Sequence, residues 1–279
     1  MLIQWGIDRS DMGMAATGGD RPKIIDMKAA MAEFVGMTLF VIIGCGTACG
    51  NGASDAASRL MVALAFGMGI LVLAYSIGHH SGGQINCAVT FSLVCGGQVP
   101  WYQGLTNLMA QLLGSMLGAG FLAGVFPCDV DLTGASLGTN AVARPGFNTG
   151  NALLGEILGT FILCFVVWET AVSKQGSKST GKNACIAIGF AVFLAHVILL
   201  PIDGCSINPT RSFGPAVVAA MRNCTAWSDS GLQDLWIFWV GPLIGGGLAA
   251  AVQYPFAMTK LKEDNEVVPI SNNLSKEVE

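Results

Sequence analysis

Six long apolar segments alternate with polar connections along the chain. A membrane-crossing helix needs about 20 consecutive, mostly apolar residues. Segments of about this length occur at positions 29–50, 58–77, 101–126, 151–173, 183–202 and 234–257. Since each is long enough for a helix that satisfies its own backbone hydrogen bonds in lipid, the pattern predicts an all-α protein with six transmembrane helices. The polar segments 1–28 and 258–279 flank this apolar domain, 29–257.

Two further apolar segments, at about 86–95 and 208–219, are too short to cross a membrane. At 1.5 Å per residue neither could span a hydrocarbon core of about 30 Å. Each follows a glycine-containing turn and begins at an asparagine, Asn86 in QINCA and Asn208 in SINPT. Backbone that turns at membrane depth is tolerated only inside protein or beside water. We therefore predict two re-entrant half-helices, each capped at its N-terminus by asparagine.

The chain repeats itself at long range. Three local patterns recur at nearly one offset: Glu33 and Glu156 (156 − 33 = 123), Gly67 and Gly189 (189 − 67 = 122), and Asn86 and Asn208 (208 − 86 = 122). Each copy, 29–126 and 151–257, holds three spans and one half-helix, and an odd number of spans forces the second copy to be inverted. Sites in inverted repeats lie near the bilayer midplane, where interrupted helices meet.

The repeat places the two half-helix N-termini opposite each other. Each supplies a partial positive charge of about half a unit, and each asparagine can turn its NH₂ group toward a central lumen. The sequence therefore predicts a neutral pore with a positive centre, which passes uncharged hydrogen-bonding molecules and repels cations.

Composition agrees with a membrane protein. Only 11% of the residues are charged, against about 25% in a typical soluble domain. The net charge of −4 gives no basic surface for nucleic acid. Most of the nine cysteines lie in apolar runs and are interpreted as small packing residues. We recognise no metal-ligand set, cofactor motif or nucleophile–base pair, so an enzyme is not predicted.

Lysine and arginine set the expected orientation. They are concentrated before the first span, in the connection 174–182 and after the last span. Because such residues favour the cytoplasmic side, both termini are expected to be cytoplasmic. Asn223-Cys-Thr then lies on the outer side and is our expected glycosylation acceptor.

Several segments resemble the aquaporin (major intrinsic protein) family over residues 29–257: AEFVG, AFGMGILVLAYSIGHHSGGQINCAVT, GEILGTF, INPTRSFGPAVV and WIFWVGP. The resemblance implies a six-helix bundle with two half-helices, one pore per subunit, and a homotetramer, which we expect in the plasma membrane. It also implies passive, single-file movement of water that excludes protons and ions. Glu33 and Glu156 are expected to hold backbone N–H groups of the re-entrant loops, with a role as proton carriers as the alternative.

Two positions depart from the family pattern. We call the three residues that begin at each asparagine an asparagine box. The first box reads Asn86-Cys87-Ala88, where the family usually has proline in the middle. Proline suits the first helical position, but cysteine leaves the asparagine cap in place, so we expect the half-helix to persist. The second box reads Asn208-Pro209-Thr210, with threonine for the usual alanine.

The family's selectivity constriction corresponds to Phe66, His196, Cys205 and Arg211. The two rings are expected to narrow the opening. Arg211 and His196 are expected to donate hydrogen bonds to one water at a time, and the charge of Arg211 repels protons and cations. The alternatives are an Arg211 paired with a carbonyl and a His196 packed in the core. Three further residues resemble those of water-selective members: Ser212, Phe238 and Trp239.

Two other functions remain open. The first is a channel for glycerol, ammonia or hydrogen peroxide. The second is a structural membrane protein that conducts weakly. His80 is a candidate for lining the cytoplasmic vestibule, where protonation could bias the pore, while His79 is expected to face the loop.

Overall fold

The computed structural model describes residues 25–173, 176–177, 181–224 and 230–266. Of the predicted flanking segments, 1–28 is described only from residue 25 and 258–279 only to residue 266. After residue 253 the description covers the backbone alone. The regular structure in the described ranges is helical. Six stretches there are long and apolar enough to cross a membrane. These results confirm the predicted all-α fold with six spans.

The long helices begin and end within a few residues of the predicted limits, except that α10 continues to Glu266, nine residues beyond the predicted end at 257. They are α1 (Met27–Asn51), α2 (Ala56–Ser81), α4 (Trp101–Val125), α5 (Thr149–Val167), α7 (Ala184–Asp203) and α10 (Ile237–Glu266). A π-helical turn, Trp168–Val172, extends α5, while the 3₁₀ turn Gly181–Asn183 precedes α7 and the short helix α9 (Ser230–Asp234) precedes α10.

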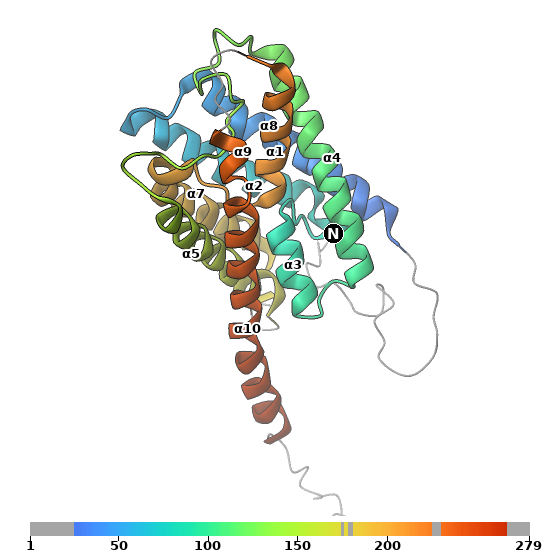
Figure 1. The fold of residues 1–279 in the computed structure, drawn as a ribbon. Coiled ribbons are helices and arrows are strands. Elements are labelled where there is room, and N and C mark those ends of the chain that lie inside the picture. Colours follow the sequence, from blue (N-terminus) through green and yellow to red (C-terminus); the bar gives the residue numbers. More distant parts are fainter. Residues whose placement is uncertain (1–24, 174–175, 178–180, 225–229, 267–279) are drawn as a thin grey trace, which may run out of the picture.

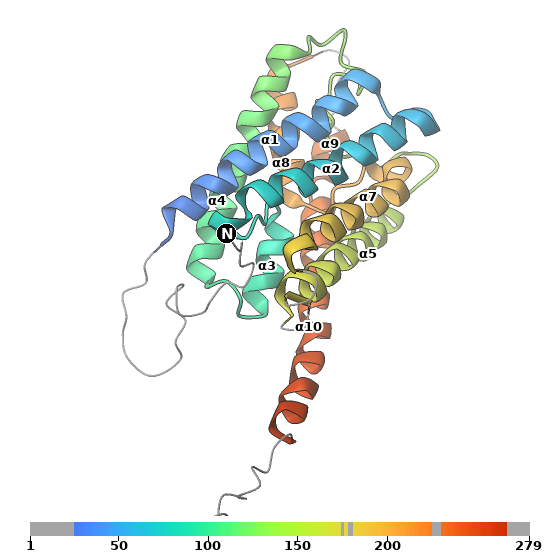
Figure 2. The ribbon, with the colours of Figure 1, turned by 180° about the vertical axis from the view of Figure 1, so that it is seen from behind.

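Two short helices lie among the long ones, α3 (Cys87–Cys95) and α8 (Pro209–Arg222) (Figures 1 and 2). They begin where the sequence predicts half-helices, and α8 continues to Arg222, slightly beyond the expected end. Both start directly after an asparagine in extended backbone conformation. The half-helices are thus set by local capping and by apolar segments too short to span.

The helices of the two halves pack in equivalent pairs. In the first half α1 packs against α2 and α4, and in the second half α5 packs against α7 and α10. The half-helices also contact the opposite halves, since α8 packs against α4 and α3 packs against α10. Each contact therefore has a counterpart in the other half, as expected for a duplicated unit.

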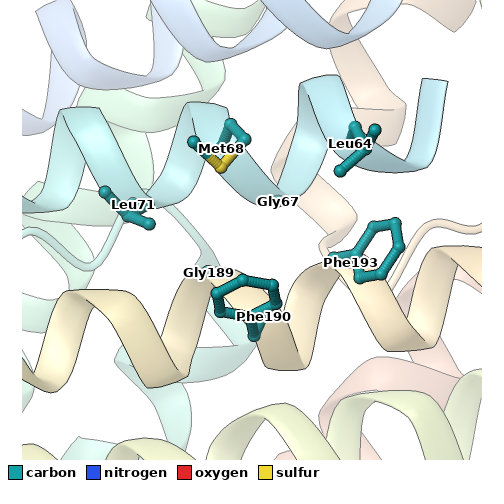
Figure 3. A pocket seen from close by; sticks show the side chains of 7 residues that line it. All are labelled: Leu64, Gly67, Met68, Leu71, Gly189, Phe190 and Phe193. Carbon is teal, nitrogen blue, oxygen red and sulfur yellow. The ribbon is translucent and has the colours of Figure 1, made fainter. Parts of the chain in front are cut away.

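The two halves also meet where α2 crosses α7. A Cβ atom at Gly67 would lie 2.8 Å from the carbonyl oxygen of Gly189, and one at Gly189 would lie 2.7 Å from that of Gly67. Glycine at both positions therefore lets the two backbones touch, as small residues do in membrane helix pairs. A shallow apolar pocket opens beside this crossing (Figure 3), and its walls are Leu64, Met68, Leu71, Phe190 and Phe193.

Large apolar side chains cover the outside of the helix bundle, while many polar side chains lie in its interior. The long helices expose large apolar side chains, including Leu64, Leu113, Phe121, Leu158 and Phe190. Polar side chains are buried among the helices instead, including Glu33, Asn107, Gln111, Ser115 and Glu156. Buried polar groups must find hydrogen-bond partners, and most of these partners lie around α3 and α8.

Candidate pore and selectivity constriction

Asparagine side chains start both half-helices. The Asn86 Oδ1 atom accepts a hydrogen bond from the backbone N–H of Ala88 at 2.8 Å. Asn208 Oδ1 accepts one from the N–H of Arg211 at 3.2 Å. These are N-cap contacts, which satisfy donors that a helix start leaves without partners. The cap fixes the position of each carboxamide, so its NH₂ group has to point away from its own helix.

Each NH₂ group reaches the opposite half of the protein. Asn86 Nδ2 donates to the carbonyl oxygen of Ile207 at 2.8 Å, and Asn208 Nδ2 donates to that of Ile85 at 2.8 Å. The two half-helices therefore meet start to start, in a reciprocal contact. Because a carboxamide has two N–H donors, each asparagine can hold this contact and also bind a molecule in the pore.

The turns before the caps are strained in the same way. Ile85 has φ 48° and Ile207 has φ 45°, a left-handed conformation that β-branched residues rarely adopt. The N–H of Ile85 donates to Glu33 Oε2 at 2.7 Å, and the N–H of Ile207 donates to Glu156 Oε2 at 2.6 Å. Each glutamate thus holds a turn whose carbonyl receives the opposite asparagine.

The other carboxylate oxygen of each glutamate binds the preceding residue. Glu33 Oε1 accepts from the N–H of Gln84 at 2.8 Å, and Glu156 Oε1 accepts from the N–H of Ser206 at 2.7 Å. Both glutamates therefore accept backbone N–H groups of the re-entrant loops, the contacts expected for the structural role. Glu33 is more heavily bonded, because Ser81 Oγ and Gln111 Nε2 also donate to it.

Three of the four expected constriction residues lie in contact. The rings of Phe66 in α2 and His196 in α7 stack, with their centroids 4.4 Å apart. The Arg211 Cζ atom lies 4.7 Å from the Phe66 ring centroid. Cys205 lies in the connection between α7 and α8, where its N–H donates to Asp203 Oδ1 at 2.9 Å. All four residues are at most 2% exposed.

The connection between α4 and α5 holds Arg211 in place. Arg211 Nη1 donates to the carbonyl oxygen of Gly138 at 2.9 Å and to Asn140 Oδ1 at 2.6 Å. Asn140 Oδ1 also accepts from Ser212 Oγ at 2.7 Å. Arg211 is therefore paired with a carbonyl while its guanidinium lies over Phe66. No pattern in the sequence marks Asn140, because it lies between spans in a loop of mixed composition.

His196 presents a hydrogen-bond acceptor when its ring is neutral. Its Nδ1 atom lies 2.8 Å from the carbonyl oxygen of Val192. A carbonyl can only accept, so Nδ1 carries the proton and Nε2 keeps a lone pair. The expectation that His196 donates is therefore wrong for the neutral ring. Among the described residues, His196 Nε2 and Arg211 Nε are buried without a protein partner, which leaves both atoms for a permeating molecule.

The remaining residues expected to matter lie around this centre. Phe238 is fully buried with Val142 and Ala152, and Trp239 meets Phe213 edge to face at 6.4 Å. Phe238 therefore packs a loop against helices, and Trp239 packs against α8. A small cavity lies between the two asparagines and His196, since all three line it.

The ends of α2 and α8 carry the last two expected positions. His80 is exposed in the last turn of α2, and its ring lies 3.8 Å from that of His79. Asn223 is exposed just after α8. The next residue, Cys224, forms a disulfide with Cys128, with their Cα atoms 6.0 Å apart.

The disulfide joins two segments on the same side of the protein. Cys128 follows α4 and Cys224 follows α8. Nearby, Arg222 Nη1 lies 3.4 Å from Asp131 Oδ2. Together these contacts tie the connection that carries Asn140 to the end of the half-helix that carries Arg211. Sequence inspection did not suggest this pair, since 96 positions separate the cysteines.

Sequence comparison supports what this geometry indicates. The family model described as major intrinsic protein matches residues 21–254. The chain belongs to the major intrinsic protein family. Its relatives in this family include aquaporin-1 of Sus scrofa, 38% identical over 250 residues, or 87% of this chain and 86% of the relative. Another is aquaporin PIP2-7 of Arabidopsis thaliana, 38% identical over 237 residues, or 83% and 81% of the two chains.

A solved structure shares the fold. The aquaglyceroporin of Plasmodium falciparum superposes with a TM-score of 0.72 at 18% identity, covering 84% of this chain and 99% of that one. As a major intrinsic protein, the chain is an integral, multi-pass membrane channel for water or small solutes and is not an enzyme.

Proposed function

We propose that this major intrinsic protein is a water-selective channel that excludes protons and ions. One observation supports the proposal above all. The stacked rings of Phe66 and His196 lie beside the Arg211 guanidinium, which is 4.7 Å from the Phe66 centroid. In the proposed channel these two rings and the fixed cation border a narrow polar passage, which favours a molecule as small as water over glycerol.

The constriction and the boxes serve different parts of this selectivity. His196 Nε2 can accept a hydrogen bond and Arg211 can donate one, so a single water can be held at both ends of its dipole. Farther along, the NH₂ groups of Asn86 and Asn208 both donate. A water that accepts from them turns its own hydrogens outward in both directions, and the positive helix ends repel cations there.

The membrane arrangement is also proposed. We expect both termini in the cytoplasm, a homotetramer, and a place in the plasma membrane. Loop charge supports the orientation. The disulfide supports it independently, because Cys128–Cys224 lies beyond the ends of α4 and α8, on the side predicted to face out, and disulfides persist in oxidising compartments.

The test is transport by the purified protein in liposomes. Stopped-flow shrinkage in sucrose should be fast with a low activation energy. Swelling in glycerol and uptake of ammonia or hydrogen peroxide should match empty liposomes, and a pH-sensitive dye should detect no protein-dependent proton flux. Rapid glycerol swelling would instead establish the small-solute channel. Slow water flux from well-assembled protein would establish the weakly conducting structural protein.

A further inference from the structure

The two half-helices differ at a pair of positions that face each other at the centre of the protein. The repeat relates Cys87 to Pro209 and Ala88 to Thr210, the positions that follow Asn86 and Asn208. Across the junction, the backbone N–H of Cys87 donates to Thr210 Oγ1 at 3.4 Å. The repeat equivalent of this pair is Pro209 with Ala88, in which Pro209 has no backbone N–H to donate and Ala88 has no hydroxyl to accept. One side of the junction thus has both donor and acceptor, while the other side has neither.

The donor at Cys87 needs a partner. Its residue is the first of α3 and is only 5% exposed. The first N–H groups of a helix have no partner within the helix, and an unsatisfied buried N–H is costly. Proline at Pro209 avoids this cost in α8, because it has no N–H. In α3 the cost is offset from outside the helix, by Thr210.

The Thr210 hydroxyl, which accepts from Cys87, also donates a hydrogen bond to the side chain of Asn208. Its oxygen lies 2.7 Å from Asn208 Oδ1 and 3.3 Å from Gln111 Oε1. A hydroxyl has one proton, and the shorter contact takes it, which leaves a lone pair for the Cys87 N–H. Asn208 Nδ2 in turn donates to the carbonyl oxygen of Ile85, two residues before Cys87. The carboxamide of Asn208 is therefore fixed at both of its ends by groups tied to the opposite half-helix.

We infer that Cys87 and Thr210 are a matched pair, in which Thr210 is a positioning residue. It satisfies the N–H that cysteine leaves at the start of α3, and it orients the Asn208 NH₂ group toward the pore. The effect on transport rests on the proposed water channel, whereas the pairing itself does not. Thr210 is fully buried, so valine can replace it with nearly the same shape and without the hydroxyl.

The test places Thr210→Val in three backgrounds: the parent, Cys87→Ala, which keeps the N–H, and Cys87→Pro, which removes it. We expect Thr210→Val to lower the thermal midpoint of the purified protein by about 2–4 °C in the first two backgrounds, and by less than half as much in Cys87→Pro. Hydrogen exchange at the start of α3 should accelerate in the same two backgrounds. Thr210→Ser, which restores the hydroxyl, should recover most of the lost midpoint.

Equal losses in all three backgrounds, or no recovery by Thr210→Ser, would overturn the pairing. If Cys87→Pro does not fold, the recovery of the thermal midpoint by Thr210→Ser in the parent and in Cys87→Ala still tests the pairing. Water flux per channel is measured on the same samples, and Thr210→Val should reduce it to about half or less where the N–H is present. A parent protein that conducts no water would refute the proposed function, while the thermal comparison would still test the pair.

Discussion

The backbone N–H of Ile207 donates a 2.6 Å hydrogen bond to the carboxylate of Glu156, and Ile207 has φ 45°. The same relationship joins Ile85 and Glu33 at 2.7 Å. A β-branched residue in this conformation persists only when its surroundings hold it. The carbonyl oxygen of each of these isoleucines accepts a hydrogen bond from the asparagine of the opposite half. By holding the two isoleucines, the carboxylates position the carbonyls that bind the asparagines.

Glu156→Gln should therefore destabilise the protein. The carboxamide keeps one acceptor oxygen and places an NH₂ group against a backbone N–H, so that this backbone N–H loses its acceptor and two donors face each other. We expect a loss of about 1–3 kcal/mol, measured by unfolding of the purified protein. Glu33→Gln should cost more, since Glu33 also accepts from Ser81 and Gln111. Parent-like stability of Glu156→Gln would contradict this, and a proton flux in the parent that Glu156→Gln abolishes would favour the proton-carrier alternative.

His196→Ala should admit glycerol. The imidazole that stacks on Phe66 is removed, so the opening widens on one side while Arg211 remains. We expect glycerol uptake in liposomes to rise about tenfold, as a barrier lower by about 1.4 kcal/mol would produce, with water flux retained. Phe190→Ala, a change on the exposed face of α7, is the control and should leave glycerol excluded. Continued exclusion by His196→Ala would show that His196 does not limit the opening.

Asn140→Ala should loosen the selectivity of the channel through Arg211. Asn140 Oδ1 accepts from both Arg211 and Ser212. Its removal leaves the Gly138 carbonyl as the one hydrogen-bond acceptor for the guanidinium among the described residues. We expect leakage of glycerol or protons in the liposome assay. Asn140→Asp keeps an acceptor oxygen and serves as the matched control. Unchanged exclusion in Asn140→Ala would mean that the Gly138 carbonyl suffices.

Loss of the Cys128–Cys224 disulfide should lower stability. The bond closes a loop across a sequence separation of 96, and removal of a native disulfide typically costs about 2–5 kcal/mol. The double variant Cys128→Ser, Cys224→Ser should unfold at a lower temperature than the parent, and reductant should shift only the parent. Cys95→Ser, at an exposed free cysteine, is the control. Free thiols at both positions in the untreated parent would contradict the assignment.

Mercurials should block water flux through Cys205. This thiol belongs to the expected constriction, where a bound metal would fill an opening of molecular width. In the flux assay, Cys205→Ser should be insensitive to mercurial, while Cys95→Ser, at the exposed free thiol, should stay sensitive. A Cys205→Ser protein that is blocked like the parent would point to Cys87, which lies at the other box.

The sequence alone determined the six spans, the two half-helices, the repeat and the two asparagine boxes. These features are local or periodic: span length depends on apolar composition, a helix start depends on its cap, and a duplication is visible as a constant offset. The repeat also marked Glu33 and Glu156 as equivalent positions, and both accept backbone N–H groups of the re-entrant loops. Their structural role stays a prediction, which Glu156→Gln tests.

Only the tertiary structure decided which atoms meet across the halves. It placed Asn140 on Arg211, paired Cys128 with Cys224, directed Nδ1 of His196 to the carbonyl of Val192, and set Thr210 against the N–H of Cys87. Each of these contacts except that of His196 joins residues more than 70 positions apart. Their geometry depends on how whole helices and loops pack, and a pattern of polar and apolar residues along the chain carries no record of that packing.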